Sequence, residues 1–347
     1  MTAFTWVDGE RLIRFGAGAL AEAPGLIAQR GMGRYVLLTT ARAAAAAPAV
    51  VDGAVAVVEV GDGPVPDAAA EIRADVAALG ARGGAPGASG AALVALGGGR
   101  VIDVAKALAA TDGYACAALP TTLAGSPMTR SHRLPAGVEG VEPVRPALVV
   151  WDPDMHVSLP PRQLVATALN ALAHAFEALY TPLANPVCEL ASLRAAELIG
   201  GELPRPGPDR ARVALGALLG GYALGSTGMA LHHAICQTVV RTAGAPHAET
   251  NAVVLPHSAA FAAGRAPGPV GRFAAALGDP DGVPAAASER IAALSAETGV
   301  AGLAQLGVGA EAVATIAAAA MAHPALGATP GGPPSEADVA AILTASL

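Results

Sequence analysis

The change of pattern near residue 153 constrains the fold of this chain more than any other feature. Before it, short apolar runs alternate with alanine-rich helical patterns. The apolar runs are 34–40, 54–60, 91–99, 115–122 and 147–153, and helical patterns occupy 19–31, 66–79 and 100–110. Strands that alternate with helices at this spacing predict βαβ units and a parallel sheet.

After Asp152-Pro153 the pattern is helical only. The stretches are 160–181, 185–203, 208–240 and the segments from Gly271 onward, with no convincing strand among them. Prolines at the start of the first stretch suit a first helical turn. A polar segment, 323–338, precedes a last short helix. We therefore predict an α/β domain over residues 1–153 and an all-helical domain over 154–347.

Composition narrows the class of protein. The chain has 347 residues, of which 53% are apolar and 3% aromatic, so alanine, valine and leucine must fill the core of two domains. A formal charge of −7 argues against a nucleic acid or an anionic membrane as partner. No run of about 18 uninterrupted apolar residues occurs, and the first residues lack a basic start and an apolar signal core. Three scattered cysteines form no C-x-x-C pair, so we expect a reduced, cytoplasmic protein.

A triple glycine, Gly97–Gly99, ends one apolar run and opens a helix. Such a turn suits a phosphate at a helix start, although a tight turn without a ligand has the same sequence. Asp103 and Lys106 lie three residues apart on that helix and share a face. Lys106 is the only lysine among 21 basic residues. This suggests a role that a planar guanidinium cannot fill, or chance survival on a solvated face.

The segment 118–131 follows the next apolar run and is rich in hydroxyl side chains. They are Thr121, Thr122, Ser126, Thr129 and Ser131. Ligands of open α/β sheets bind at the carboxyl ends of strands, where this loop is expected. An ordinary hydroxyl-rich turn is the other interpretation.

Polar residues also recur on the helices of the second half. Asn170, His174 and Glu177 fall at i, i+4 and i+7, which places them on one helix face. His233 and Gln237 are one turn apart, and His247 follows on a later segment. Three neutral imidazoles on separate segments can hold a divalent ion, whereas each histidine alone is more often a satisfied core residue.

Taken together and in order, these segments resemble the iron-containing alcohol dehydrogenase family, and most closely its maleylacetate reductase branch. The motifs are GGGRVIDVAK, PTTLAGS, NALAHAFEALY, GMALHHAICQ, PHAET and VVLPH. The resemblance implies a homodimer with its active site in the cleft between the domains and NADH or NADPH as cofactor. The implied cofactor-binding residues are Gly97, Gly98, Gly99, Asp103, Lys106, Thr121, Thr122, Ser126 and Thr39.

The chain departs from the family pattern around the site. The family's four metal-binding positions fall on Asn170, His174, His233 and His247. Asn170 replaces the carboxylate, as in the reductase branch, and the loss of the one anionic ligand weakens the attraction for a hard divalent ion. We therefore expect no obligate metal. Gln237 stands where the family carries a histidine beside the substrate.

Two further departures lie near the cofactor: Pro127 replaces a carboxylate of the second loop, and the following hairpin lacks a family lysine. No acidic residue follows the first predicted strand, whereas Arg42 could accept a 2′-phosphate, which slightly favours NADPH.

We predict an NAD(P)H-dependent reductase of a small unsaturated or keto acid. Hydride would reach the carbon β to a carbonyl. His233, His247 and Gln237 would polarise the oxygen, and His174 and Asn170 would orient the acid group. The alternative is a non-redox descendant of the fold, which would catalyse elimination, isomerisation or cyclisation or only bind a ligand.

Overall fold

The computed structural model describes residues 3–81, 91–157 and 159–347, and the chain divides into two compact units, Met1–Ser158 and Leu159–Leu347. This division lies slightly beyond the boundary expected at residue 153. Asp152 explains the difference: its carboxylate accepts hydrogen bonds from the backbone N–H groups of Gly18 (3.2 Å), Leu20 (2.9 Å) and Asp154 (2.9 Å). These bonds keep the short helix η3 (Pro153–His156) with the first unit.

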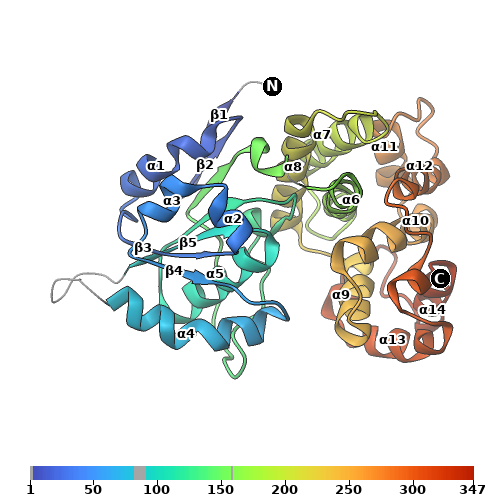
Figure 1. The fold of residues 1–347 in the computed structure, drawn as a ribbon. Helices are drawn as coiled ribbons and strands as arrows, with labels where there is room; N and C mark the ends of the chain where they lie inside the picture. Colours follow the sequence, from blue (N-terminus) through green and yellow to red (C-terminus); the bar gives the residue numbers. More distant parts are fainter. Residues whose placement is uncertain (1–2, 82–90, 158) are drawn as a thin grey trace. The chain divides into compact units, whose positions relative to one another are not determined.

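A seven-stranded sheet forms the first unit (Figure 1). Its strands are β1 (Phe4–Asp8), β2 (Arg11–Phe15), β3 (Tyr35–Thr39), β4 (Ala56–Glu59), β5 (Ala92–Gly97), β6 (Cys116–Pro120) and β7 (Leu148–Trp151), in the order β1-β2-β7-β6-β5-β3-β4. The strands from β2 to β4 in that order pair in parallel, which confirms the predicted sheet.

The antiparallel ribbon of β1 and β2 at the sheet edge was not predicted. In the structure, the side chains of β1 alternate in exposure, and the turn between the two strands contains Gly9 with φ of +59°. Both strands are short and contain charged residues, which masks the alternation in the sequence.

Helices cover both faces of this sheet. They are α1 (Ala23–Gln29), α2 (Ala41–Ala45), α3 (Pro48–Asp52), α4 (Val65–Ala81) and α5 (Gly99–Asp112), with the short 3₁₀ helices η1 (Ala19–Glu22) and η2 (Ser126–Met128). Residues of α4 and α5 pack with Val36, Leu38 and Leu93 into one apolar cluster. Residues of α1 and α3 pack with Leu37 and Val94 into the cluster on the opposite face.

The strand order creates a switch point between β3 and β5. From β3 the chain moves outward to β4, and from β5 it moves the other way to β6. The connections that leave the carboxyl ends of β3 and β5 therefore diverge, which is where open α/β sheets bind ligands. Gly97 ends β5 and pairs in register with Pro120, the last residue of β6, so the turn after β5 and the loop after β6 start side by side.

The second unit is helical throughout its described residues. Its helices are α6 (Pro161–Ala178), α7 (Pro186–Glu202), α8 (Arg210–Thr227), α9 (Leu231–Ala243), α10 (His247–Arg265), α11 (Pro267–Ala276), α12 (Pro284–Ala296), α13 (Val313–Ala320) and α14 (Glu336–Ala345), with the 3₁₀ helices η4 (Leu303–Leu306), η5 (Ala310–Ala312) and η6 (Pro324–Ala328). Helix α6 packs against α7, α8 and α10. It is therefore enclosed, and all residues of its second half are buried.

The stretch 208–240, helical by sequence, is two helices. Thr227 ends α8, Gly228 has φ of +75°, and α9 starts at Leu231 at an angle of 99° to α8. In the described ranges, no single helix is long and apolar enough to cross a membrane, and α8 with α9 passes that test only as a bent pair.

Candidate functional site

The glycine turn in the first unit lies against the hydroxyl-rich loop. Gly98 is the N-cap of α5, and no side chain caps its first turn. A Cβ atom at Gly98 would lie 3.2 Å from Thr122, and one at Gly99 would lie 3.0 Å from Ala124. The close packing of the turn on the loop therefore requires small residues with or without a ligand. The uncapped N–H groups at the start of α5 are suited to an anion such as a phosphate.

Lys106 is fully buried, and its ammonium group binds within the protein. Its Nζ lies 3.0 Å from Asp103 Oδ1, 3.0 Å from the Ser126 carbonyl oxygen, 3.3 Å from Ser126 Oγ and 2.9 Å from the Ser131 carbonyl oxygen. Ser126 Oγ also donates to Asp103. Three donors meet four acceptors around one nitrogen, a geometry that suits a compact ammonium and not a planar guanidinium. Lys106 thus fixes the loop that faces the glycine turn.

Two threonines expected near the cofactor make contacts within the sheet. Thr39 is buried, and its Oγ1 donates to the Leu96 carbonyl oxygen at 2.9 Å, which ties β3 to β5. The backbone N–H of Thr121 donates to the Gly97 carbonyl oxygen at 2.9 Å. Both lie at the carboxyl edge of the sheet, so these contacts shape the region where a cofactor is expected.

A cavity of about 520 Å³ opens at the carboxyl ends of β3 and β4. Its lining carries charges of both signs, from Arg42, Glu59, Asp62, Glu71 and Arg100. Glu59 Oε1 accepts the N–H of Ala41 at 3.2 Å. The sequence placed no acidic residue directly after β3. The structure supplies Glu59 from the end of the neighbouring strand, a contact that depends on strand order and not on local spacing.

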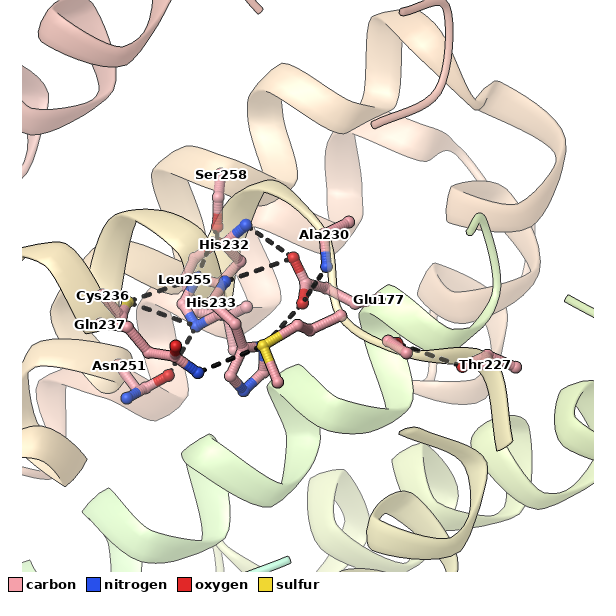
Figure 2. Close-up of polar contacts among 12 residues, drawn as sticks. Glu177, Thr227, Ala230, His232, His233, Cys236, Gln237, Asn251, Leu255 and Ser258 are labelled. Atoms are coloured by element: carbon pink, nitrogen blue, oxygen red, sulfur yellow. Dashed lines mark hydrogen bonds and ion pairs between the residues drawn. The ribbon is translucent and has the colours of Figure 1, made fainter. Parts of the chain in front are cut away.

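Glu177 organises the polar centre of the second unit (Figure 2). It lies on α6, is fully buried, and accepts hydrogen bonds from three backbone N–H groups at the start of α9. The donors are Ala230 (3.0 Å), His232 (2.6 Å) and His233 (3.4 Å). Helix α9 has no side-chain cap of its own, so a carboxylate from another helix caps it. Burial raises the pKa of Glu177, and these N–H donors and His232 oppose that shift.

Glu177 also sets the tautomer of His233. Its Oε2 lies 2.6 Å from His233 Nδ1, and Oε2 is already the acceptor for the N–H of Ala230. Nδ1 is therefore the protonated nitrogen, and Nε2 carries a lone pair. Burial, with His247 and His323, lowers the pKa of His233 to about 3. A neutral imidazole in this tautomer accepts a hydrogen bond at Nε2, which favours a hydroxyl or an acid proton at that atom over the carbonyl oxygen that the sequence suggested.

Three buried polar atoms around this centre have no hydrogen-bond partner among the residues described: Asn170 Oδ1, His174 Nδ1 and His233 Nε2. The rings of His174 and His233 are stacked, with centroids 4.9 Å apart. Asn170 lies one turn before His174 on the same face of α6. Orphaned buried polar atoms are rare in proteins unless a ligand or water satisfies them, so these three neighbouring residues form a candidate binding site.

His247 is the first residue of α10 and is exposed. Asn251, one turn later, donates from Nδ2 to the carbonyl oxygen of His247 (2.7 Å) and lies 3.3 Å from its Nε2. The Oδ1 of Asn251 lies 3.0 Å from His232 Nε2. Burial and the neighbouring His233 lower the pKa of His232 to about 3. Asn251 therefore joins His232 and His247, a role that no sequence motif indicated.

Gln237 makes contact with a histidine that the sequence did not single out. Its Oε1 lies 3.1 Å from Nε2 of His323, which precedes η6, and its Nε2 lies 3.2 Å from Sδ of Met229. The sequence indicated only a polar segment over residues 323–338 before a last short helix. The structure forms η6 within this segment, and η6 packs against α9, which holds His323 beside Gln237.

The donor set lacks an anionic ligand for a hard divalent metal. It offers an amide oxygen and neutral imidazoles, and the nearby carboxylate of Glu177 is used by α9 and His233. Within residues 3–81, 91–157 and 159–347, no group of three or more His, Cys, Asp or Glu side chains is arranged to hold a metal ion.

Comparison with known proteins places both units in one family of sequences. Residues 164–347 match the profile described as Fe-containing alcohol dehydrogenase family, C-terminal, and residues 14–131 match the profile described as iron-containing alcohol dehydrogenase. Maleylacetate reductase 1 of Rhodococcus opacus is 42% identical over 197 residues, which is 53% of this chain and 55% of the relative. The match thus spans about half of that relative's length.

A longer match reaches the maleylacetate reductase of Burkholderia cepacia, which is 35% identical over 80% of this chain and 81% of its own length. Among solved structures, maleylacetate reductase from Agrobacterium tumefaciens has a TM-score of 0.83 at 29% identity and covers 100% of this chain and 99% of its own. A sulfoacetaldehyde reductase from Bifidobacterium kashiwanohense, solved with NAD⁺, shares the fold at 22% identity and a TM-score of 0.78, over 96% of each chain.

Proposed function

Because this chain belongs to the iron-containing alcohol dehydrogenase family, we propose that it is an NAD(P)H-dependent reductase of a small unsaturated or keto acid, with maleylacetate as the model substrate. The observation that carries the proposal is the match to a maleylacetate reductase at 35% identity over 80% of the chain. The buried, unpartnered polar atoms of Asn170, His174 and His233 support it, because they offer a candidate binding site within the residues that match the family's C-terminal profile.

The first unit fits a nicotinamide dinucleotide. The uncapped start of α5 and the glycine turn would hold its pyrophosphate, and the loop fixed by Lys106 would border it. When bound, the reduced nicotinamide supplies the hydride. That the site lies in a cleft between the two domains stays a prediction.

The second unit would bind the acid and stabilise the charge that develops on it. Addition of hydride at the carbon β to a carbonyl moves negative charge onto the carbonyl oxygen, which then needs hydrogen-bond donors. The amide of Gln237 has donors to offer, whereas His233 Nε2 offers a lone pair and suits a hydroxyl or carboxylic acid proton. We assign His174 and Asn170 to orientation of the acid group, and His247, at the exposed start of α10, to contact with the reacting oxygen.

We propose that the reaction needs no metal. Asn170 supplies a neutral oxygen where a carboxylate would attract a cation, and the neighbouring donors are uncharged imidazoles. Purified protein should contain much less than one equivalent of iron or zinc, and a chelator should leave its activity unchanged. A stoichiometric metal whose removal abolishes turnover would contradict this proposal.

We propose NADPH as the preferred cofactor form, on the strength of Arg42 in the cavity beyond β3. Glu59 and Asp62 in the same lining oppose a 2′-phosphate, so the expected preference is modest. Arg42→Ala should weaken the binding of NADPH by about tenfold, which is the effect of one lost charge-assisted hydrogen bond. The affinity for NADH should change by less than about twofold. Equal losses for both forms would remove Arg42 from phosphate binding.

The direct test mixes the protein with maleylacetate and NADH or NADPH and follows the near-ultraviolet absorbance of the reduced cofactor. Consumption of the cofactor that depends on substrate supports the proposal. Cofactor binding in a titration without any oxidation would favour the non-redox descendant, to which the replacements at Gln237 and Pro127 also point.

Assembly and location complete the proposal. We propose a homodimer that works in the cytoplasm on a small-molecule acid, without nucleic-acid or membrane partners, as the family resemblance, composition and charge predict. Analytical ultracentrifugation tests the dimer, and fractionation of the source cells tests the location.

A further inference from the structure

Gln237 occupies the position where a histidine was expected, and His323 lies directly against it. Both residues belong to the second unit, and both are half-buried. His323 Nε2 and Gln237 Oε1 are 3.1 Å apart, which is a hydrogen-bond distance. The pair therefore joins the start of η6 to α9.

The other ring nitrogen of His323 decides which atom carries the proton. The backbone N–H of Ala325 donates to His323 Nδ1 at 3.2 Å. A backbone N–H can only donate, so Nδ1 presents a lone pair and the proton resides on Nε2. His323 Nε2 is thus the donor, and Gln237 Oε1 is the acceptor.

This contact fixes the orientation of the Gln237 amide. With its oxygen toward His323, its NH₂ group faces Sδ of Met229 at 3.2 Å. A thioether is a weak acceptor, so a ligand oxygen would compete readily for these two N–H donors. Without the histidine, the amide could rotate and present its oxygen to the ligand instead.

The surroundings of His323 keep it uncharged. Burial and Arg241 on α9 lower its pKa, and Glu177 on α6 acts in the opposite direction. A positive charge on His323 would also repel a positive charge on His233, and this repulsion lowers the pKa of His233. His323 is therefore suited to hold an amide in place and not to deliver a proton.

We propose that Gln237 donates a hydrogen bond to a carboxylate or enolate oxygen of the substrate, and that His323 is the positioning residue that selects this orientation of the amide. Gln237, held by His323, can donate the hydrogen bond that a histidine at position 237 would donate. Unlike that histidine, it cannot act as a general acid. This inference rests on the proposed function only for the identity of the substrate.

Kinetics with maleylacetate test the donor. Gln237→Glu is isosteric and still accepts from His323, but it presents an anionic acceptor to the substrate, so kcat/KM should fall by at least about 100-fold. His323→Leu should lower kcat/KM by about tenfold because the amide loses its fixed orientation. His323→Gln restores a donor and should recover most of that loss. The matched control Gln163→Glu, on the exposed start of α6, should have the activity of the unaltered protein.

Nitrogen NMR of the unaltered protein distinguishes a ligand donor from a purely structural contact, because only a ligand donor changes its signals when the ligand binds. At neutral pH, His323 should be neutral with its proton on Nε2, and the Gln237 side-chain N–H signals should shift on titration with maleate, a dicarboxylate, in the absence of reduced cofactor. His323→Leu should abolish that shift while maleate binding weakens. A positively charged His323, a proton on Nδ1, or unchanged Gln237 signals at saturating maleate would overturn the inference.

The two proposals can fail separately. A protein that does not oxidise NADH or NADPH with maleylacetate, yet shows the maleate-dependent shift and its loss in His323→Leu, loses the reductase assignment and keeps the donor. A protein that reduces maleylacetate with equal kcat/KM in the Gln237→Glu variant keeps the reductase assignment and loses the donor.

Discussion

Glu177 Oε2 and His233 Nδ1 lie 2.6 Å apart, and the same carboxylate caps the helix that carries the histidine. One side chain thus sets the position of α9 and the tautomer of its buried imidazole. Stability and site chemistry are coupled at this contact, because any change to Glu177 alters both.

Glu177→Gln should lower the free energy of unfolding by about 2 to 4 kcal/mol, since the new NH₂ group meets backbone donors and leaves buried groups unsatisfied. Urea denaturation measures this change. The control is Glu197→Gln on α7, where Glu197 pairs with Arg194 at 2.7 Å and both are half-exposed, so the cost should be below about 1 kcal/mol. Equal losses in the two variants would contradict the capping role of Glu177.

Acid should destabilise the second unit. His232 and His233 have a pKa of about 3 in the folded protein against 6.5 for an ordinary histidine. The unfolded chain binds protons that the folded chain excludes, so stability is complete above pH 6.5 and is lost as the pH falls below it. Each such histidine contributes about 1.4 kcal/mol per pH unit.

Urea titrations at a series of pH values below 6.5 measure this slope. His232→Gln should reduce it by about one proton, because the buried imidazole is gone. His257→Gln, at a half-buried position with a smaller environment effect, should retain most of the slope. An unchanged slope in His232→Gln would mean that other groups cause the acid sensitivity.

Lys106→Arg should destabilise the first unit nearly as much as Lys106→Met, by on the order of 2 to 3 kcal/mol, because a guanidinium does not fit among four acceptors around one nitrogen. Both variants should also weaken binding of NADH, since the loop that lies on the glycine turn is released. The control Arg73→Met removes a partly exposed ion pair with Asp112 at 2.6 Å and should cost about 1 kcal/mol or less. A fully stable Lys106→Arg would show that the site tolerates any cation.

Asn170→Asp should raise affinity for Fe²⁺ or Zn²⁺ by about tenfold or more, because it adds the one anionic oxygen that the donor set lacks. Calorimetric titration of metal into the purified variant measures the gain. Asn185→Asp makes the same chemical change at the N-cap of α7, where the side chain bonds to Leu183, Val187 and Cys188, and should leave metal affinity unchanged. Equal affinity in Asn170→Asp and the unaltered protein would show that Asn170 is outside the donor set.

In the Gln237→His variant, the pH dependence of kcat for maleylacetate should show a pKa typical of a histidine, because the new side chain can give up a proton beside His323. A general acid typically contributes on the order of 10²- to 10⁴-fold, so turnover should rise if proton delivery limits the rate. The pH dependence of kcat measures this, with Gln163→His on the exposed start of α6 as control. If the variant binds NADH or NADPH but still oxidises neither, the proposal that maleylacetate-like acids are the substrates is wrong.

Much of the fold and part of the candidate site could be predicted from local pattern. The alternation of apolar runs and helical stretches predicted the parallel strands and the helical second unit, because periodicity reports which face of each element is buried. The edge ribbon β1–β2 and the break at Gly228 were missed. Short strands and a glycine within a helical pattern give weak local signals, and tertiary packing decides them.

For the site, the chemical groups that are present follow directly from the sequence: the Gly97–Gly99 turn, the lone Lys106, and the replacements at Asn170 and Gln237. What each group contacts depends on the folded chain. It surrounded Lys106 with acceptors, turned Glu177 onto the start of α9, and brought His323 to Gln237 across many residues of sequence. Tautomers and amide orientations depend on such distant partners, because a ring nitrogen or an amide takes its donor or acceptor role from whatever faces it in the folded chain.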